Sequence, residues 1–315
     1  MLSVKNVSKE FKIDKETSLF ALNDVSLDIN HRETVAIIGE SGCGKSTLAK
    51  LITKIEDITS GTISFEGKDI SKMSKREVLD YRKDVQMVFQ NPSNVFSPRM
   101  KIGRFLMESW MNYEHMGKKQ AKEESLYSLR RVHLGEEYFD KYPHELSGGE
   151  LQRVAIARAI ALHPKLLICD EATSALDVSI QKEIVELLVE HRETVDFAIL
   201  FISHDLAVAE KLCDKVAIMY LGRIVEVLEG KRLKANVKHP YSKALIESVF
   251  SIRDGREKKI KVIEGEPPSP INLPQGCGFY ERCKYAGDVC KEKNPSLKEC
   301  GGSHLVACHM VNNNK

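Results

Sequence analysis

The chain has 315 residues, of which 42% are hydrophobic, and its 47 basic residues nearly balance its 45 acidic ones, leaving a net charge of +2. This length allows one sizeable core with an appendage, or two modest domains. The evenly mixed charge excludes a strongly basic or acidic tail. Apolar runs such as residues 198–202 are far shorter than the ~20 residues of a membrane-spanning helix. The first residues are charged and alternating, unlike a signal peptide, so we expect the chain to remain in the cytoplasm.

In chain order, the predicted elements are those of an α/β fold. Residues 35–38, 166–169 and 198–202 are apolar throughout, as strands of a parallel sheet buried under helices are. Residues 101–143 are amphipathic and rich in charge, which predicts a helical insertion. Residues 215–226 contain two β-type runs separated by a Leu-Gly pair and predict a hairpin.

The first ligand-binding motif is a phosphate-binding loop, because residues 39–47 match G-x-x-x-x-G-K-[ST]. Glycines let backbone N–H groups curl around phosphates, and the following helix presents its positive end to them. Lys45 is expected to neutralise the β- and γ-phosphates, and the Ser46 hydroxyl to ligate Mg²⁺. A helix N-terminus also favours a thiolate at Cys43. The residues expected to bind nucleotide here are Gly39, Ser41, Gly42, Cys43, Gly44, Lys45, Ser46 and Thr47.

Two further motifs supply acidic groups and a second anion site. Asp170 and Glu171 end an apolar run, where an acidic side chain is costly unless it faces a cation. Asp170 is therefore expected to hold Mg²⁺ through water, and Glu171 to polarise an attacking water. Residues 146–150 read Leu-Ser-Gly-Gly-Glu, in which Ser147 is a natural N-cap and two glycines expose backbone donors. Alone, this motif is also compatible with an ordinary helix start.

Taken together, the motifs resemble those of the ABC ATPases over residues 1 to about 230. The resemblance implies a P-loop NTPase fold with a RecA-like core and a helical subdomain at about residues 91–154. It also implies a head-to-tail dimer, in which ATP lies between the P-loop of one subunit (residues 39–47) and the signature motif of the other (residues 146–150). The matching residues are 39–47, Gln90, 146–153, Asp170, Glu171, 174–177 and His204.

The resemblance assigns a role to each matching residue. Glu171, His204 and Gln90 are expected to be catalytic, and Ser46, Gln90 and Asp170 to hold Mg²⁺. Ser147, Gly148 and Gly149 are expected to contact the nucleotide of the partner subunit, and Asp177 to cross the dimer seam. Phe11 is expected to stack on adenine, with a core aromatic as the alternative. Glu150, where glutamine is commonest, and Ala172, where proline is frequent, depart from the pattern without removing a phosphate ligand.

Beyond residue 230 the sequence resembles the C-terminal extension of oligopeptide and dipeptide importer ATPases, a group that includes nickel importers. The resemblance rests on residues 239–245, 264–271 and the cysteine-containing segments that follow, and residues 86–100 also match this group. We expect a linker and extension over residues 231–276, whose proline-rich part cannot be helical. A small cysteine-rich C-terminal module is expected over residues 277–315, as a unit separate from residues 1–230.

Four cysteines of this tail, separated by five, six and seventeen residues, are candidate metal ligands. In a reducing compartment, such a density indicates metal ligation before disulfides. Some family members carry a [4Fe–4S] cluster on the matching cysteines, and four thiolates suit such a cluster. Structural zinc and free buried thiols are the alternatives. The four residues are Cys277, Cys283, Cys290 and Cys308.

The expected function is that of an ATP-binding and ATP-hydrolysing subunit of an ABC importer for oligopeptides or dipeptides. The expected partners are a second, non-identical ATPase subunit, two membrane permease subunits and, indirectly, an extracellular substrate-binding protein. Such a chain lies at the cytoplasmic face of the membrane. A nickel or metal-chelate importer is one alternative. A soluble ABC protein acting on DNA or ribosomes is another, disfavoured by the single cassette and by the lack of a basic patch for nucleic acid.

Overall fold

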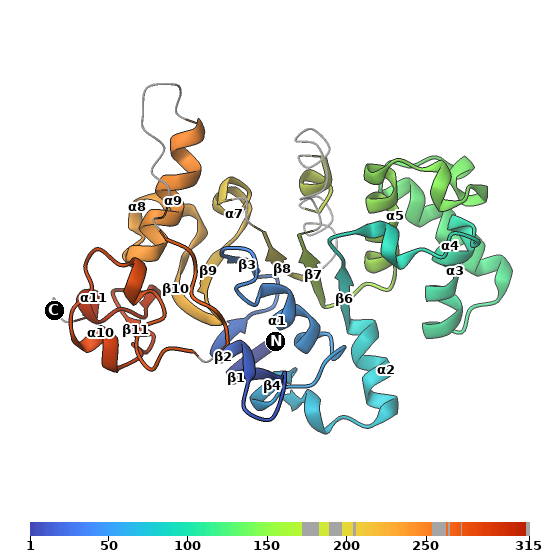
Figure 1. The fold of residues 1–315 in the computed structure, drawn as a ribbon. Helices are drawn as coiled ribbons and strands as arrows, with labels where there is room; N and C mark the ends of the chain where they lie inside the picture. The colour runs from blue at the N-terminus through green and yellow to red at the C-terminus, as the bar shows by residue number, and fades with distance from the viewer. Residues whose placement is uncertain are drawn as a thin grey trace. The chain divides into compact units, whose positions relative to one another are not determined.

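The computed structural model describes residues 1–171, 183–188, 197–203, 206–253, 263, 265–271 and 273–312 (Figure 1). These residues form two compact units. The first unit contains Met1–Ile29, Thr34–Ser71 and Ser203–Lys315, and the second contains Asn30–Glu33 and Lys72–Ile202. Among the described residues, no helix is both long and apolar enough to cross a membrane. Because residues 277–312 belong to the first unit, a separate cysteine-rich module is not confirmed.

The first unit begins with an antiparallel sheet in the order β2-β1-β4-β5. Its strands are β1 (Leu2–Lys12), β2 (Ser18–Ile29), β4 (Ser60–Phe65) and β5 (Lys68–Asp69). Val4 of β1 lies opposite Leu27 of β2 and Ile63 of β4, and all three side chains are buried. Side-chain burial ends along the second half of β1, which leaves the tip of this strand accessible.

The same unit contains buried strands that position the P-loop. Strand β3 (Thr34–Ile38) is buried along its whole length and runs parallel to β9 (Lys215–Tyr220). The predicted hairpin is confirmed, because β9 pairs antiparallel with β10 (Arg223–Glu229). Both turn residues, Leu221 and Gly222, have positive φ angles of 45° and 73°, as a tight two-residue hairpin turn requires. Beyond β10 the sheet continues through two-residue strands, β12 (Leu305–Val306) and β11 (Lys298–Glu299).

Short helices and an extended linker complete the first unit. The proline-rich part of the linker is extended as predicted, since Ile271 forms a β-bridge with Leu19 and the Phe20 N–H donates to the Pro270 carbonyl over 3.0 Å. The helices are α1 (Lys45–Ile52), η1 (Ile70–Lys72, reaching the second unit), α7 (Leu206–Leu212), η5 (Gly230–Arg232), α8 (Leu233–Asn236), α9 (Pro240–Arg253), η6 (Tyr280–Arg282), α10 (Val289–Glu292) and α11 (His309–Asn312).

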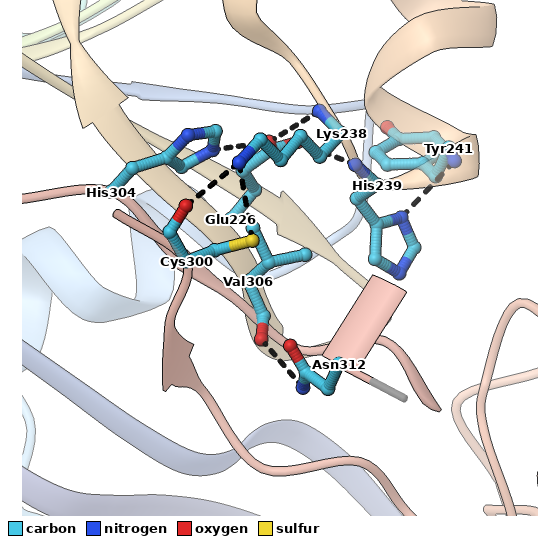
Figure 2. A network of polar contacts seen from close by, with 8 residues as sticks. All are labelled: Glu226, Lys238, His239, Tyr241, Cys300, His304, Val306 and Asn312. Carbon is cyan, nitrogen blue, oxygen red and sulfur yellow. Dashed lines mark hydrogen bonds and ion pairs between the residues drawn. The ribbon is translucent and has the colours of Figure 1, made fainter. Parts of the chain in front are cut away.

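A buried carboxylate ties three segments of this unit together (Figure 2). Glu226 of β10 has no exposed surface, and its oxygens accept the backbone N–H groups of Lys238 at 2.7 Å and His239 at 3.1 Å. The His304 ring nitrogen lies 2.6 Å from the same carboxylate. Burying a charge requires such partners, so Glu226 joins β10, the start of α9 and the C-terminal tail.

The second unit contains three parallel strands, with helices before and after the first of them along the chain. Strands β6 (Val85–Val88), β7 (Leu166–Asp170) and β8 (Ala198–Ile202) lie in the order β8-β7-β6, and β7 and β8 are buried throughout, as their apolar runs predict. The predicted helical insertion is also confirmed. The helices of this unit whose bounds are described are α2 (Lys75–Asp84), η2 (Pro92–Val95), α3 (Ile102–Tyr113), α4 (Lys118–Arg131), η3 (Glu136–Asp140), η4 (Pro143–Glu145) and α5 (Gly148–Ala161). Residues 183–188 are helical as well.

Candidate nucleotide-binding site

The P-loop of the first unit connects β3 to α1. Two of its positions must be glycine, because neighbouring backbone atoms leave no room for a side chain. A Cβ atom at Gly39 would lie 2.2 Å from a backbone oxygen of β9, and one at Gly44 would lie 2.4 Å from a backbone oxygen of β2. Gly44 also has a φ of 109°, which side chains rarely adopt. The Gly222 N–H of the β9–β10 turn donates to the Cys43 carbonyl over 2.9 Å, so the hairpin supports the loop.

Lys45 opens helix α1, and its ammonium is held by the loop itself. The residue is only 4% exposed, and Nζ donates to the carbonyl oxygens of Gly39 and Glu40, each at 2.9 Å. A buried ammonium needs such acceptors, and the phosphate oxygens of a nucleotide are chemically suited to replace them. Ser41 and Gly42 are exposed at the mouth of the loop, whereas Ser46 and Thr47 are half-buried in the first helical turn.

The Cys43 thiol differs from its prediction. The residue is 6% exposed, and burial raises the pKa of its thiol above the ordinary value, an effect that the nearby Lys45 only partly offsets. The predicted thiolate is therefore wrong. The helix N-terminus favours an anion, but packing of the loop against neighbouring strands removes the water that would solvate it.

Sequence reasoning missed two residues that hold the P-loop from the C-terminal part of the chain. The Tyr241 hydroxyl accepts the Glu40 N–H over 3.1 Å. The Arg282 guanidinium binds both oxygens of the Glu40 carboxylate, at 3.0 and 3.2 Å. These contacts span 201 and 242 residues of sequence, so no local pattern signals them.

Phe11 lies near the end of β1 with 39% of its surface exposed. The Lys9 ammonium lies 4.8 Å from the centre of its ring, which is within the range of a cation–π contact. The alternative of a core aromatic is therefore wrong. An exposed ring at a strand end is available to stack on a flat ligand, and its contact with adenine stays a prediction.

In the second unit, the predicted carboxylates follow each other at the end of β7. Asp170 is the last residue of the strand and is 5% exposed. Glu171 has a φ of 45°, an uncommon conformation for a residue other than glycine and one often found at functional sites. Its N–H donates to the Ile202 carbonyl over 2.9 Å, which fixes this conformation.

The structure brings Gln90 and Glu171 together across 81 residues of sequence. The Gln90 amide donates to a Glu171 carboxylate oxygen over 2.6 Å. An amide donor here can orient the carboxylate. The oxygen of the same amide is chemically able to accept a hydrogen bond or to ligate a cation. Asp177 and His204, the other two predicted residues of this part of the chain, lie outside the described residues.

The signature motif starts helix α5 as predicted, with Ser147 as its N-cap. The Glu150 N–H donates to the Ser147 hydroxyl over 3.3 Å, and the Ser147 N–H and hydroxyl both donate to the Glu150 carboxylate at 2.7 Å. This reciprocal arrangement is a capping box. Ser147 and Gly148 are exposed at the helix start, and Gly149 is buried beneath them.

Glu150, the departure from the usual glutamine, carries a charge at this helix start. Hydrogen bonds lower the pKa of its carboxyl, first from the Tyr138 hydroxyl and then from the Ser147 backbone and side chain. Glutamate can therefore complete the capping box, and its negative charge suits the positive end of the helix.

None of the eight cysteines, all of which lie among the described residues, forms a disulfide. In the tail, burial first and then the neighbouring thiols of Cys290, Cys308 and Cys283 raise the pKa of the Cys277 thiol to about 11. The four predicted ligands therefore share one neighbourhood. Among the described residues, however, no group of three or more His, Cys, Asp or Glu side chains is arranged to hold a metal ion. The iron–sulfur site is not supported by this arrangement and stays a prediction.

Comparisons with known sequences match both parts of the chain. The pattern of the family described as ABC transporter matches residues 22–174, and that of the oligopeptide/dipeptide transporter C-terminal region matches residues 225–290. A probable peptide ABC transporter ATP-binding protein of Sinorhizobium fredii, y4tS, is 42% identical over 98% of this chain and 90% of its own length. The chain belongs to the ABC transporter family. The oligopeptide transport ATP-binding protein OppF of Haemophilus influenzae is 41% identical over 99% of this chain and 97% of its own.

Solved structures show the ABC ATPase cassette fold as well. A dimeric ATP-binding cassette, MJ0796, in a post-hydrolysis state with ADP and Pi, superimposes with a TM-score of 0.67 at 28% identity, covering 73% of this chain and 98% of its own. The cbiO1 protein of Clostridium perfringens, part of the ABC transporter complex cbiONQ, superimposes with a TM-score of 0.66 over 80% of this chain and 96% of its own, also at 28% identity. This ABC chain is an ATP hydrolase whose activity is coupled to transport.

Proposed function

We propose that this chain is the ATP-hydrolysing subunit of an importer that takes up oligopeptides or dipeptides. The observation that carries the proposal is the match of residues 225–290 to the oligopeptide/dipeptide transporter C-terminal region. Relatives named for peptide transport agree with it over nearly the full chain, including the di/tripeptide transport protein DppF of Pseudomonas aeruginosa, 40% identical over 98% of this chain. A nickel or metal-chelate importer is the alternative, and an uptake assay distinguishes it from a peptide importer.

In this proposal, the chain pairs with a second, non-identical ATPase subunit. The pair acts on two permease subunits at the cytoplasmic face of the membrane. Residues 39–47 hold the phosphates of one ATP, Phe11 stacks on its adenine, and the signature motif of the partner closes over it. In return, Ser147, Gly148 and Gly149 of this chain close over the partner's ATP, with Asp177 at the seam. Closure of the pair drives the permeases, and hydrolysis reopens it.

Three side chains, Glu171, Gln90 and His204, perform the proposed hydrolysis. Glu171 polarises the attacking water, Gln90 contacts Mg²⁺ and this water, and His204 contacts the γ-phosphate and helps to orient Glu171. The 2.6 Å contact between Gln90 and Glu171 supports this grouping. The Ser46 hydroxyl, the Gln90 amide oxygen and the Asp170 carboxylate are hard oxygen donors that fit Mg²⁺. When bound, the cation supplies positive charge beside the β- and γ-phosphates.

An uptake experiment tests the substrate class. The chain would be expressed with its permeases and second ATPase, and the complex reconstituted in vesicles supplied with ATP and the substrate-binding protein. We expect uptake of a labelled tripeptide and none of ⁶³Ni²⁺, and no uptake when this chain carries Glu171→Gln. Nickel uptake without peptide uptake would establish the alternative, and copurification with ribosomes or DNA instead of permeases would overturn the transport function.

The finer proposal for the tail is a [4Fe–4S] cluster on Cys277, Cys283, Cys290 and Cys308. Support comes from their shared neighbourhood and from the composition of the segment. Among its described residues, the buried apolar side chains besides cysteines are Phe279, Val306 and Ala307. So small a core usually needs a metal or covalent staple. A [4Fe–4S] cluster is larger than a single metal ion. Its four cysteine ligands therefore need not lie as close together as the ligands of a single ion.

Elemental analysis of protein purified without oxygen tests this ligand set. We expect about four irons per chain and a matching amount of sulfide, because one cubane contains four of each. Cys283→Ser is expected to lose the iron, whereas Cys300→Ser, which changes a cysteine outside the set, is the matched control and should retain it. Stoichiometric zinc without iron would establish a zinc site, and protein without metal would establish free thiols.

A further inference from the structure

Glu40 of the P-loop is bound by a side chain of the cysteine-bearing tail. Arg282 Nη1 lies 3.0 Å from one Glu40 carboxylate oxygen, and Nη2 lies 3.2 Å from the other. This two-pronged geometry is the strong form of an arginine–carboxylate pair. The Arg282 side chain is 6% exposed and that of Glu40 is 23% exposed, so solvent screens the pair far less than it screens a surface ion pair.

The Arg282 guanidinium is fixed in place by aromatic residues as well. It lies 5.8 Å from the ring centre of Tyr220 and 5.9 Å from that of Phe279, and Nη1 donates to the Tyr220 hydroxyl over 3.3 Å. The Tyr220 and Phe279 rings meet edge to face, with centres 5.3 Å apart. The guanidinium is therefore presented to Glu40 by packed rings, with little freedom to swing away.

Both backbone polar groups of Glu40 form hydrogen bonds. Its N–H donates to the hydroxyl of Tyr241 at 3.1 Å, and Tyr241, on α9, has no exposed surface. Its carbonyl accepts Lys45 Nζ at 2.9 Å. One P-loop residue thus connects the C-terminal part of the chain to the lysine that binds phosphate.

We infer that Arg282 is a positioning residue for the P-loop, through which the cysteine-bearing tail sets the affinity of this subunit for ATP. Without Arg282, the Glu40 carboxylate is left partly buried without this partner, which is costly. The loop then shifts toward solvent, and the carbonyls that orient Lys45 move with it. This regulation rests on the proposed nucleotide function of residues 39–47, and it differs from the expectation that the tail is a separate module.

The inference is tested by measuring how tightly the purified full chain binds a fluorescent ADP analogue in the presence of Mg²⁺. We expect Arg282→Ala to weaken binding about tenfold, equivalent to about 1.4 kcal/mol, and Arg282→Lys to lie between, because an ammonium cannot bind in two prongs. Tyr241→Phe, which removes one hydroxyl, should also weaken binding. The matched control is Arg232→Ala, since Arg232 belongs to the same extension but pairs with Glu229 at 3.4 Å while 68% exposed. It should bind as wild type.

A double-mutant cycle separates positioning from general damage. If Arg282 acts through Glu40, Glu40→Gln combined with Arg282→Ala loses less affinity than the sum of the two single losses. In the assembled transporter, the KM for ATP should rise in Arg282→Ala while kcat at saturating ATP stays near wild type. Additive losses, or wild-type affinity in Arg282→Ala, would overturn the inference. Should that variant not fold, Arg282→Lys and Tyr241→Phe decide by the same measurement.

Failure of the inference is distinguishable from failure of the nucleotide function. Wild-type protein that does not bind the probe, or Lys45→Ala protein that binds it as tightly as wild type, would remove the proposed function itself. Normal binding by wild type, with a loss in Lys45→Ala and none in Arg282→Ala, would remove only the role of the tail.

Discussion

At the scale of single residues, the two halves of the nucleotide chemistry are held by different means. The Lys45 ammonium donates to backbone carbonyls of its own loop, so phosphate binding would replace these neutral acceptors with anionic ones, which form stronger hydrogen bonds. Glu171 is held by the Gln90 amide and by its backbone contact to β8. In the proposed function the lysine governs ATP binding and the carboxylate governs turnover, so substitutions should separate the two.

Glu171→Gln should keep ATP binding and stop turnover. The amide cannot accept a proton from the attacking water, and general base catalysis is typically worth about 10²–10⁴-fold. ATPase rates of the assembled transporter and nucleotide binding to the same protein check this pair of outcomes. A hydrolysis rate near wild type would show that another group is the base.

The Cys43 thiol should react slowly with maleimide at pH 7. Because burial raises its pKa, the thiolate fraction at pH 7 is smaller than that of an ordinary cysteine, and the rate should increase as the pH rises toward that pKa. Alkylation should inhibit ATP hydrolysis, because the adduct occupies phosphate space, and Mg-ATP should protect. Equal inhibition of a Cys43→Ala variant would place the sensitive thiol elsewhere in the chain.

At the scale of elements, the strands and the loop between β3 and α1 were predictable because their signals are local. A run that is apolar on both faces, or glycines at fixed spacing, is visible in a few consecutive residues. The two-residue strands β11 and β12 have no such pattern and form only because an edge of β10 is available. Burial of Cys43 and the partners of Glu40 likewise depend on segments distant in sequence, and only the structure shows them.

The environment of Glu226 could be predicted only in part from the sequence. It stands in the middle of the apolar run Ile-Val-Glu-Val-Leu, and a charge within a buried strand indicates specific partners. The sequence therefore signals that partners exist. It does not identify them, because His304 lies 78 residues away in a segment whose composition indicates metal binding rather than a hydrogen bond to a buried carboxylate.

The junction of β10, α9 and the tail should make stability depend on pH through His239. Burial lowers the pKa of this ring from 6.5 to about 4, against the opposing attraction of Glu226. Between these two values the unfolded chain binds a proton that the folded chain does not. The free energy of unfolding should therefore fall as the pH falls from 6.5 to 4.

Urea unfolding at pH 7, 6 and 5 checks this dependence. His239→Gln should lower the unfolding midpoint at every pH, because the buried ring packs near Phe279, but its midpoint should change less with pH than that of wild type. Groups that titrate in both proteins cancel in this comparison. Identical pH slopes would assign the dependence to other residues.

At the scale of the whole molecule, the proposed function requires two chains for each nucleotide. This chain presents a P-loop in one unit and a capped signature helix in the other, and the solved cassette MJ0796 that it resembles is a dimer bound to ADP and Pi. If the signature helix serves the partner's ATP, damage to it should leave this chain's own ATP binding intact. Binding and closure are then separable by a single substitution.

Ser147→Arg should abolish transport without weakening nucleotide binding to the P-loop of the same chain. Ser147 is exposed at the start of α5, so a longer side chain there can project outward without disturbing a core. In the closed dimer, it would fill the space that the partner's γ-phosphate requires. Nucleotide binding to the purified chain checks the second half of this expectation. ATP-dependent closure of the complex checks the first half, and it is measured by crosslinking across the seam with Glu171→Gln present to prevent hydrolysis.

Ser147→Ala is the matched control, because it removes the cap without adding bulk. Loss of an N-cap costs about 0.5–2 kcal/mol of stability, so this variant measures the structural cost of changing the residue. It should melt earlier than wild type and still close in ATP. If Ser147→Arg also closes in ATP, no phosphate of the partner occupies this position, and the shared-site arrangement is wrong. Closure by Ser147→Ala but not by Ser147→Arg would show that the exposed end of α5 faces the nucleotide of the other subunit.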